Sequence, residues 1–510
     1  MYMGNTNTYE QYEKRLLFKF IKTCIFSLLG ISNQVKNNFD IDTNYKEIEC
    51  TNYAFTQNGN TYFGAKGKNF AFFIEENIKN NVNWCNKILE VFFKTIHCNS
   101  TLFSDDKTLL YYYDSTDQSK SYISLAKSYT SKYEKQLFDF IIERGIINWI
   151  VPSQKVPTLR IERLFSILEN WSKKTYEGHN VCFGILLNTD FCKDSKVDEN
   201  VYSDSFLDFL EEEYSATLSD GISSMIEINI NCEFKGYVSL TNDDTIKECK
   251  LKDSVLPYRF AQIIKANVIK NKIGIFLLQN GDVIIAKNEK IIFIKRNGKW
   301  LNFQYSSFEK IVREKLLKKE GVIISKLLQH CFATCLDVSL SHTGGIIAIV
   351  DLDSKEENKE RFYSIISKID NLSLNITEEK LFNDEIKQNK KEVDFDGDEK
   401  RRKDLRKRIT KRKMLLSLLD KYKHNANILY TKIDRKLRTE LTGMDGASIV
   451  DINGNVIAFG AIIKNDAGSS GGGRGAAAKA LSCFGGFAIK ISTDGYIEVF
   501  VNKILIYSIK

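Results

Sequence analysis

Short apolar runs separated by turn residues mark the clearest elements of this chain. Residues 273–278, 283–286 and 291–294 are three such runs, with Asn280-Gly281 between the first two and Asn297-Gly298 after the third. Asn-Gly beside apolar runs is the strongest short signal for a β-hairpin. The pattern therefore predicts a β-meander near the end of the first 305 residues.

After residue 305 the pattern alternates between helical and strand periods. Helical spacing predicts one or two helices over 308–338, and residues 343–350 form an uncharged run typical of a strand buried on both faces. Hairpins are predicted over Asn453-Gly454 and Asp494-Gly495, with a glycine-rich stretch and an alanine-rich helix between them. We expect an α/β (α+β) fold, with a mixed central sheet flanked by helices at the C-terminus.

The length of 510 residues corresponds to about three domains at roughly 150 residues each. The first 150 residues mix helices with short strands, and Pro152 and Pro157 suggest a boundary after them. We expect an α+β region over 1–150, a second one over 151–305 that ends in the meander, and a C-terminal domain over 306–510. A charged insertion over about 354–424 interrupts that last domain.

Charge is concentrated in the insertion, although 73 Lys and Arg against 65 Asp and Glu give the whole chain a net charge of +8. Residues 354–399 are acidic, whereas residues 400–413 hold ten basic residues and one Asp. Apolar residues at helical spacing make the basic run the polar face of an amphipathic helix. Such a face either binds nucleic acid or is simply solvated beside the acidic stretch, and both alternatives stay open.

Cysteine usage and hydropathy indicate a cytoplasmic protein. The eleven cysteines form no Cys-X-X-Cys pair, as expected for reduced thiols. No apolar stretch reaches the ~18 residues of a membrane span, and residues 16–31 fit an amphipathic helix better than a signal peptide. Near residue 330, only Cys331 and Cys335 share a helical face, which is too few ligands for a metal site.

The sharpest chemical motif is a glycine-rich loop around Arg474 that runs directly into a helix. Glycines let backbone N–H groups approach an anion, the helix N-terminus is positive, and arginine offers paired donors to phosphate. The alternative is a flexible surface loop. A second motif, Asp445-Gly446-Ala447, begins a strand. A carboxylate there would hold Mg²⁺ or Mn²⁺ beside a phosphate, whereas an isolated Asp-Gly pair is more often a turn.

Taken together, these motifs resemble the catalytic domain of bacterial diadenylate cyclases, which join two ATP molecules into cyclic di-AMP. The resemblance covers about 308–509, with the charged segment as an insertion. The family's Asp-Gly-Ala motif matches Asp445 to Ala447, and its Arg-Thr-Gly-Ala-Leu-Ile strand is approximated by residues 342–347. The resemblance implies that Asp445 is the catalytic residue and holds the metal, and that nucleotide is contacted by Thr343, Gly344, Gly446, Ala447, Gly472, Gly473, Arg474 and Gly475.

The second family signature, Gly-Thr-Arg-His-Arg-Ala-Ala, is only partly present, at residues 472–478. Arg474 and the alanine pair remain, but Gly475 stands in place of the His and Ala476 in place of the second Arg. The Glu pair of a later family segment is absent from residues 491–495. Because such groups stabilise charge on reacting phosphates, we expect nucleotide binding to be kept and turnover to be weakened.

Three functional hypotheses follow. The leading one is a nucleotide-binding or nucleotide-sensing protein whose ligand is an adenine nucleotide, ATP or a dinucleotide. The second is an active, divergent diadenylate cyclase in which Ser469, Ser470 or Lys479 replaces the lost donors, and the family implies a face-to-face homodimer or higher oligomer for it. The third is a nucleic-acid-associated protein that works through residues 400–413. No membrane partner is expected.

Overall fold

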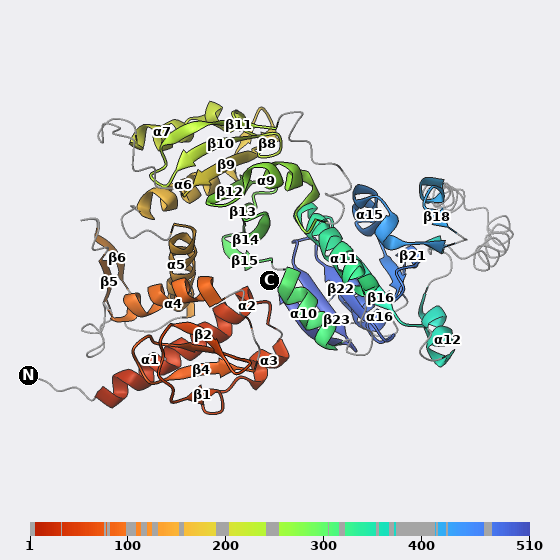
Figure 1. The fold of residues 1–510 in the computed structure, drawn as a ribbon, viewed down its shortest axis with the longest axis horizontal. Coiled ribbons are helices and arrows are strands. Elements are labelled where there is room, and N and C mark those ends of the chain that lie inside the picture. The colour runs from red at the N-terminus through yellow and green to blue at the C-terminus, as the bar shows by residue number, and fades with distance from the viewer. Residues whose placement is uncertain are drawn as a thin grey trace, which may run out of the picture. The chain divides into compact units, whose positions relative to one another are not determined.

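The computed structural model groups the chain into two compact units (Figure 1). The N-terminal unit comprises residues 1–244 and 263–303, and the C-terminal unit comprises residues 245–262 and 304–510. Each unit is described by itself. The structure describes residues 6–31, 33–75, 78, 82–97, 109–113, 120–124, 131–151, 158–189, 203–240, 254–303, 305–315, 322–352, 356–366, 372–373, 414, 417–424, 427–463 and 472–510. The expected boundaries near 150 and 305 stay a prediction, and the basic run 400–413 lies outside the described residues.

The N-terminal unit begins with a long helical segment beside a small antiparallel sheet. The helical segment consists of α1 (Thr6–Phe20), η1 (Ile21–Ile25) and α2 (Phe26–Leu28). The sheet has the order β1-β4-β3-β2, formed by β1 (Tyr45–Lys46), β2 (Ala54–Gln57), β3 (Asn60–Gly64) and β4 (Ala71–Ile74). Further elements are α3 (Asn33–Asn38), α4 (Val82–His97), the hairpin β5 (Leu109–Tyr113) and β6 (Lys120–Ser124), α5 (Ser131–Ile150) and α6 (Thr158–Trp171).

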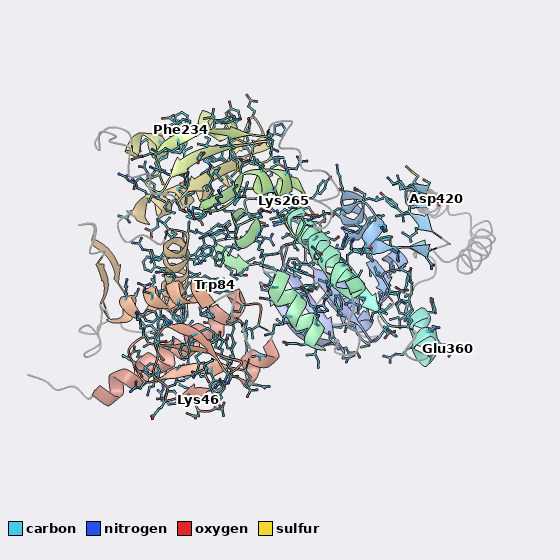
Figure 2. The ribbon with its side chains drawn as sticks, viewed as in Figure 1. Lys46, Trp84, Phe234, Lys265, Glu360 and Asp420 are labelled. Atoms are coloured by element: carbon cyan, nitrogen blue, oxygen red, sulfur yellow. The ribbon has the colours of Figure 1, made fainter. Side chains whose placement is uncertain are left out.

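A seven-stranded sheet with the order β11-β10-β9-β12-β13-β14-β15 forms the rest of this unit. Its strands are β9 (Phe183–Asn188), β10 (Ser224–Asn229), β11 (Phe234–Ser239), β12 (Lys272–Leu277), β13 (Val283–Lys287), β14 (Lys290–Arg296) and β15 (Lys299–Asn302). Only β9 and β10 run parallel in this sheet, and β12 to β14 are the predicted meander, which β15 extends by one strand. Smaller elements are β7 (Thr175–Tyr176), β8 (His179–Asn180), α7 (Ser203–Glu211), η4 (Glu213–Thr217) and most of α9 (Ala261–Asn267), whereas η6 (Tyr258–Phe260) belongs to the C-terminal unit. Phe234, on the edge strand β11, is 55% exposed (Figure 2).

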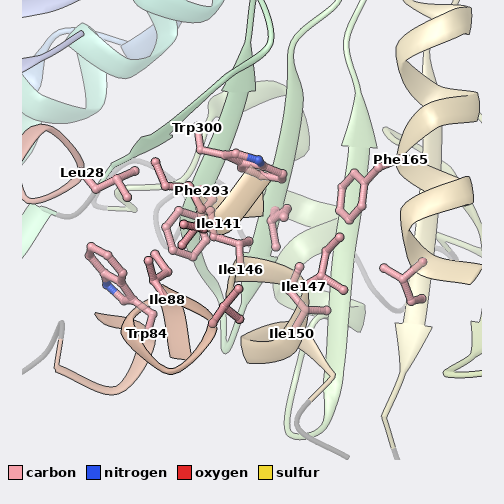
Figure 3. Close-up of a cluster of buried hydrophobic side chains, with 14 of the residues drawn as sticks. Leu28, Trp84, Ile88, Ile141, Ile146, Ile147, Ile150, Phe165, Phe293 and Trp300 are labelled. Atoms are coloured by element: carbon pink, nitrogen blue, oxygen red, sulfur yellow. The ribbon is translucent and has the colours of Figure 1, made fainter. Parts of the chain in front are cut away.

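One hydrophobic core joins the helices of the N-terminal unit to its large sheet. The indole of Trp84 on α4 meets the ring of Phe293 on β14 edge to face, with 5.6 Å between ring centroids. Phe165 on α6 contacts Trp300 on β15 in the same way, at 5.5 Å. Figure 3 shows these rings around isoleucines of α5. Residues on both sides of position 150 therefore share this core.

The C-terminal unit is built on a mixed seven-stranded sheet with the order β17-β21-β20-β16-β22-β23-β24. Its strands are β16 (Gly345–Val350), β17 (Leu372–Ser373), β20 (Ala447–Asp451), β21 (Val456–Ala461), β22 (Phe487–Ile491), β23 (Ile497–Val501) and β24 (Ile504–Ile509). β16 runs parallel to β20 and antiparallel to β22. All six residues of β16 are buried, as its uncharged sequence predicts. The chain is thus mixed α/β with several sheets, and the coarse fold expectation is confirmed.

Helices cover both faces of this sheet. Ala477 and Ala478 of α16 (Gly472–Leu481) pack with Ala348 and Ala488 on one face, where small side chains allow the helix to approach closely. On the other face, Phe308 of α10 (Tyr305–Lys315) contacts strand residues of β22 and β24. α11 (Val322–Ser341) and α15 (Arg435–Thr442) complete that layer, and the remaining elements are α12 (Glu356–Ile365), β18 (Lys423–His424), β19 (Asn427–Ile428) and η7 (Tyr430–Lys432).

Candidate functional site

Strands β20, β16 and β22 are neighbours in the C-terminal sheet. One end of each lies at the same edge of the sheet, the edge that is formed by strand ends. Because β16 and β20 are parallel, with Ile346 opposite Ala447, their N-terminal ends lie side by side. β22 is antiparallel to β16, with Ile491 opposite Gly345, so its C-terminal end reaches the same edge. The register thereby brings the Thr343-Gly344 segment, the Asp445-Gly446-Ala447 motif and the end of β22 together.

Arg474 joins the glycine-rich segment to this edge. A Cβ atom added to Gly344 would lie 2.9 Å from Nη1 and 3.2 Å from Cζ of Arg474, so the guanidinium lies directly over the Gly344 backbone. Gly344 also has a φ of +69°, a conformation that favours glycine. Among the described residues, Arg474 has no hydrogen-bond or ion-pair partner. The five N–H donors of its guanidinium thus lie beside the backbone of Gly344, which carries no side chain.

The start of β16 rests on the end of helix α15. Thr343 is exposed, and its Oγ1 lies 3.0 Å from where a Cβ of Gly443 would be placed. Thr442 is buried, and its hydroxyl lies 3.2 Å from that of Ser448 on β20. The end of α15 therefore fixes the positions of both strand starts that frame the candidate site.

Gly446 permits an unusually close approach between two backbones. Its φ is +102°, and an added Cβ would lie 2.4 Å from the carbonyl carbon of Gly460 on β21. The pairing of β20 with β21 shifts register just after Ala447, which is the mark of a β-bulge. Bulges of this kind redirect a side chain or end a strand pairing next to functional sites. Here the bulge follows directly after Asp445 and Gly446.

Asp445 is the one predicted metal ligand. Its side chain is exposed and has no hydrogen-bond or ion-pair partner among the described residues. Those residues also hold no group of three His, Cys, Asp or Glu side chains that would form a complete metal site. Mg²⁺ is usually held by one or two carboxylates together with substrate phosphates. Asp445 therefore fits Mg²⁺ or Mn²⁺ that arrives bound to a nucleotide, for which it would supply one oxygen ligand.

The first turn of α16 presents the other predicted contacts. Gly472 and Gly473 are exposed, whereas Gly475 and the alanines after it are buried against the sheet. A helix start leaves backbone N–H groups without partners inside the helix, and this end carries partial positive charge. Ser469 and Ser470, two suggested replacements for the lost donors, lie outside the described residues. The third, Lys479, stands further along the helix, where its ammonium lies over the ring of Phe500.

Lys490 also lies beside this turn of α16, although it belongs to none of the predicted motifs. Its Nζ lies 3.9 Å from where a Cβ of Gly475 would be placed, and it donates a 2.7 Å hydrogen bond to Oε2 of Glu498. Lys510 also pairs with Glu498, at 2.5 Å. Burial alone would raise the pKa of Glu498, but the hydrogen bonds from both lysines hold that pKa below its ordinary value. Glu498 is therefore a charged carboxylate shared by two ammonium groups.

Strand alternation could have revealed Lys490. The hairpin over Asp494-Gly495 pairs Lys490 with Glu498, and Lys490 lies two residues after Ala488 on the same strand. Side chains two apart on a strand share a face, and Ala488 packs with Ala477 and Ala478 of α16. The sequence signal for Lys490 was therefore a lysine at a helix-facing position of an otherwise apolar strand.

Behind the site, α15 is anchored by two buried arginines. Arg435 pairs with Asp337 of α11, at 2.7 Å between Nε and Oδ2. Arg438 contacts Nδ1 of His330 and donates to the carbonyl of Tyr430, and burial lowers the pKa of its guanidinium. Because an arginine can only donate, His330 accepts through Nδ1. His330 thus belongs to a buried hydrogen-bond network.

Comparisons of the chain with protein-family models, with curated proteins and with solved structures found no match. The resemblance to diadenylate cyclases therefore stays a prediction that rests on the motifs of the chain. No helix in the described part of the chain combines the length and the apolar character that crossing a membrane requires. Gly344 and Asp445 precede the neighbouring starts of β16 and β20, and Arg474 lies over Gly344.

Proposed function

We propose that the C-terminal unit is a diadenylate-cyclase-like domain that binds, and thereby senses, an adenine nucleotide. The observation that carries the proposal is the Arg474 guanidinium, which lies over the backbone of Gly344 and has no partner among the residues that the structure describes. A guanidinium with free donors suits a phosphate, which it binds through paired hydrogen bonds. The exposed backbone of Gly472 and Gly473 begins the adjoining helix, where anions are favoured.

The divergent signature favours sensing over turnover. Gly475 and Ala476 lack the side chains that the family's His and second Arg would supply. Transition-state stabilisation depends on such preorganised donors, and the loss of one costs about 3 kcal/mol. Backbone N–H groups and Arg474 remain to bind the ground state. The domain is thus suited to hold a nucleotide, ATP or a dinucleotide, rather than to convert it.

Thermal unfolding of the full chain tests the proposal with ATP, AMP and cyclic di-AMP as separate probes. A ligand at one hundred times its Kd stabilises the folded state by about 2.7 kcal/mol, which raises the melting temperature by several degrees. Arg474→Ala should abolish the shift, whereas Arg361→Ala, which removes an exposed arginine of α12, should retain it. The absence of a shift with all three probes would overturn the proposal.

An active cyclase is the second candidate, and the Asp445 carboxylate favours it because it has no partner in the described part of the chain. Incubation of the full chain with labelled ATP and Mn²⁺ would yield cyclic di-AMP if the domain turns over. Asp445→Asn should then abolish the product, because the amide is a weaker metal ligand than the carboxylate. Product formation of this kind would replace the sensing proposal. A dimer in solution would accompany it, since the family reaction joins nucleotides held by two facing sites.

A further inference from the structure

The ammonium of Lys490 lies beside the position that a Cβ atom would take at residue 475. The two are 3.9 Å apart, within the first turns of α16. The Lys490 side chain is 19% exposed, so a ligand at the helix start can reach it. A cation from β22 thus lies in van der Waals range of the Cβ position of Gly475.

The bond to Glu498 does not use up this cation. An ammonium group has three donors, and across the described residues one of them is used, toward Oε2 of Glu498. Lys510 pairs with the other carboxylate oxygen, Oε1, and shares in neutralising its charge. The three side chains together carry one net positive charge, which an anion beside Gly475 would experience.

We propose that Lys490 is a phosphate-binding residue of the candidate site and supplies, together with Arg474, the positive charge that the divergent signature lacks. The inference rests on the proposed function, since it assigns a phosphate contact within the same site. Arg474 belongs to the first turn of α16 and its guanidinium lies over Gly344, just before β16, whereas Lys490 reaches Gly475 of the same turn from β22. The ligand class is a nucleotide whose phosphates span the first turn of α16.

Glu498 pairs with Lys490 without being a ligand itself. Its carboxylate would repel a phosphate, and it is drawn toward the lysine pair instead. Removing the charge of Glu498 therefore distinguishes two roles for Lys490, which are pairing with Glu498 and binding phosphate. If Lys490 served only to pair with Glu498, Lys490→Met and Glu498→Gln would affect the protein alike. If Lys490 binds phosphate, the two variants differ in affinity.

Calorimetric titration of the full chain with ATP, AMP and adenosine tests this assignment. Lys490→Met should weaken ATP binding by about 10- to 100-fold, the value of a charged hydrogen bond. Adenosine, which lacks phosphate, should bind equally to both proteins. Lys490→Arg should restore most of the affinity for ATP, and Glu498→Gln should leave it unchanged or increase it. Lys503→Met serves as the matched control. It removes the same charge from the exposed turn between β23 and β24, at the other end of this hairpin from Lys510.

The outcomes separate this inference from the proposed function. ATP binding that Arg474→Ala abolishes and Lys490→Met leaves intact would overturn the role of Lys490 and keep the nucleotide site. An equal loss of affinity in Lys490→Met and Glu498→Gln would assign Lys490 to structure alone and would also overturn it. Failure of the unaltered chain to bind ATP, AMP and cyclic di-AMP would overturn both proposals together.

Discussion

The guanidinium of Arg435 and the carboxylate of Asp337 form a buried ion pair in which Nε lies 2.7 Å from Oδ2. The same guanidinium donates to the carbonyls of Ser254 and Leu256, and Asp337 also accepts from the backbone N–H of Tyr258. One arginine thus ties α15, α11 and the segment 254–258 together.

We expect Arg435→Met to destabilise the C-terminal unit strongly. Removing one partner of a buried ion pair leaves the other charge uncompensated and costs about 3–5 kcal/mol. Lys436→Ala, an exposed neighbour on the same helix, should change stability by less than about 0.5 kcal/mol. The four tryptophans (84, 149, 171 and 300) all lie in the other unit, so their fluorescence does not report this change directly. Hydrogen exchange at the amides of α11 and α15 measures it instead.

Gly344→Ala should remove nucleotide binding through Arg474. The new methyl group would lie 2.9 Å from Nη1 and displace the guanidinium. Gly454→Ala is the matched control, because Gly454 also has positive φ, at +89°, but its added Cβ meets only Leu429, at 4.0 Å. Both variants should lose about 1–2 kcal/mol of stability from backbone strain. Titration with ATP should show the loss of affinity in Gly344→Ala alone, and equal affinity in both would contradict the placement of Arg474.

The contribution of Glu498 to stability should depend on pH. Because the pKa of Glu498 is lower in the folded chain than its ordinary 4.5, folding favours the charged form. Its stabilisation is present at neutral pH and is lost as the pH falls below 4.5 and through the folded-state pKa. Glu498→Gln should be less stable than the unaltered chain by about 1 kcal/mol at pH 7, and the difference should vanish in acid. Urea unfolding at a series of pH values measures it, and a difference that does not change with pH would contradict the ion pairs.

Cys331 and Cys335 should be unreactive in the folded chain. Burial raises the pKa of Cys331 to about 12 and that of Cys335 well above its ordinary value, so both thiols stay protonated near neutral pH. Cys483, which is partly exposed, is the internal control within the same unit. Alkylation at pH 8 followed by peptide mass spectrometry should label Cys483 first and the buried pair only after unfolding. Early labelling of the pair would show that α11 opens in the folded state.

Local patterns made much of this fold predictable. The meander and the β20–β21 and β22–β23 hairpins carry Asn-Gly or Asp-Gly turns, which report their geometry directly. β24 was not predicted, because the turn before it uses Asn502 and Lys503, both with positive φ, instead of glycine. Helix α15 was not predicted either, because Arg435 and Arg438 resemble surface residues although both are fully buried.

The candidate site was predictable only in part for a similar reason. Its motifs are contiguous in sequence, so Asp445 and Arg474 were named before their convergence was known. Lys490 comes to the first turn of α16 through strand pairing, and its ammonium lies 3.9 Å from the Cβ position of Gly475. Contacts of this kind follow from the register in which strands pair, and a short sequence motif does not specify that register.

The bonds from Arg435 to Ser254 and Leu256 also decide how the C-terminal unit can be excised for study. The chain contributes to this unit twice, through residues 245–262 and again from 304 onward, with strands of the other unit in between. A fragment that starts at residue 304 would lack both carbonyls and leave the guanidinium short of two acceptors. A workable fragment needs the earlier stretch spliced to residue 304 by a linker that replaces residues 263–303.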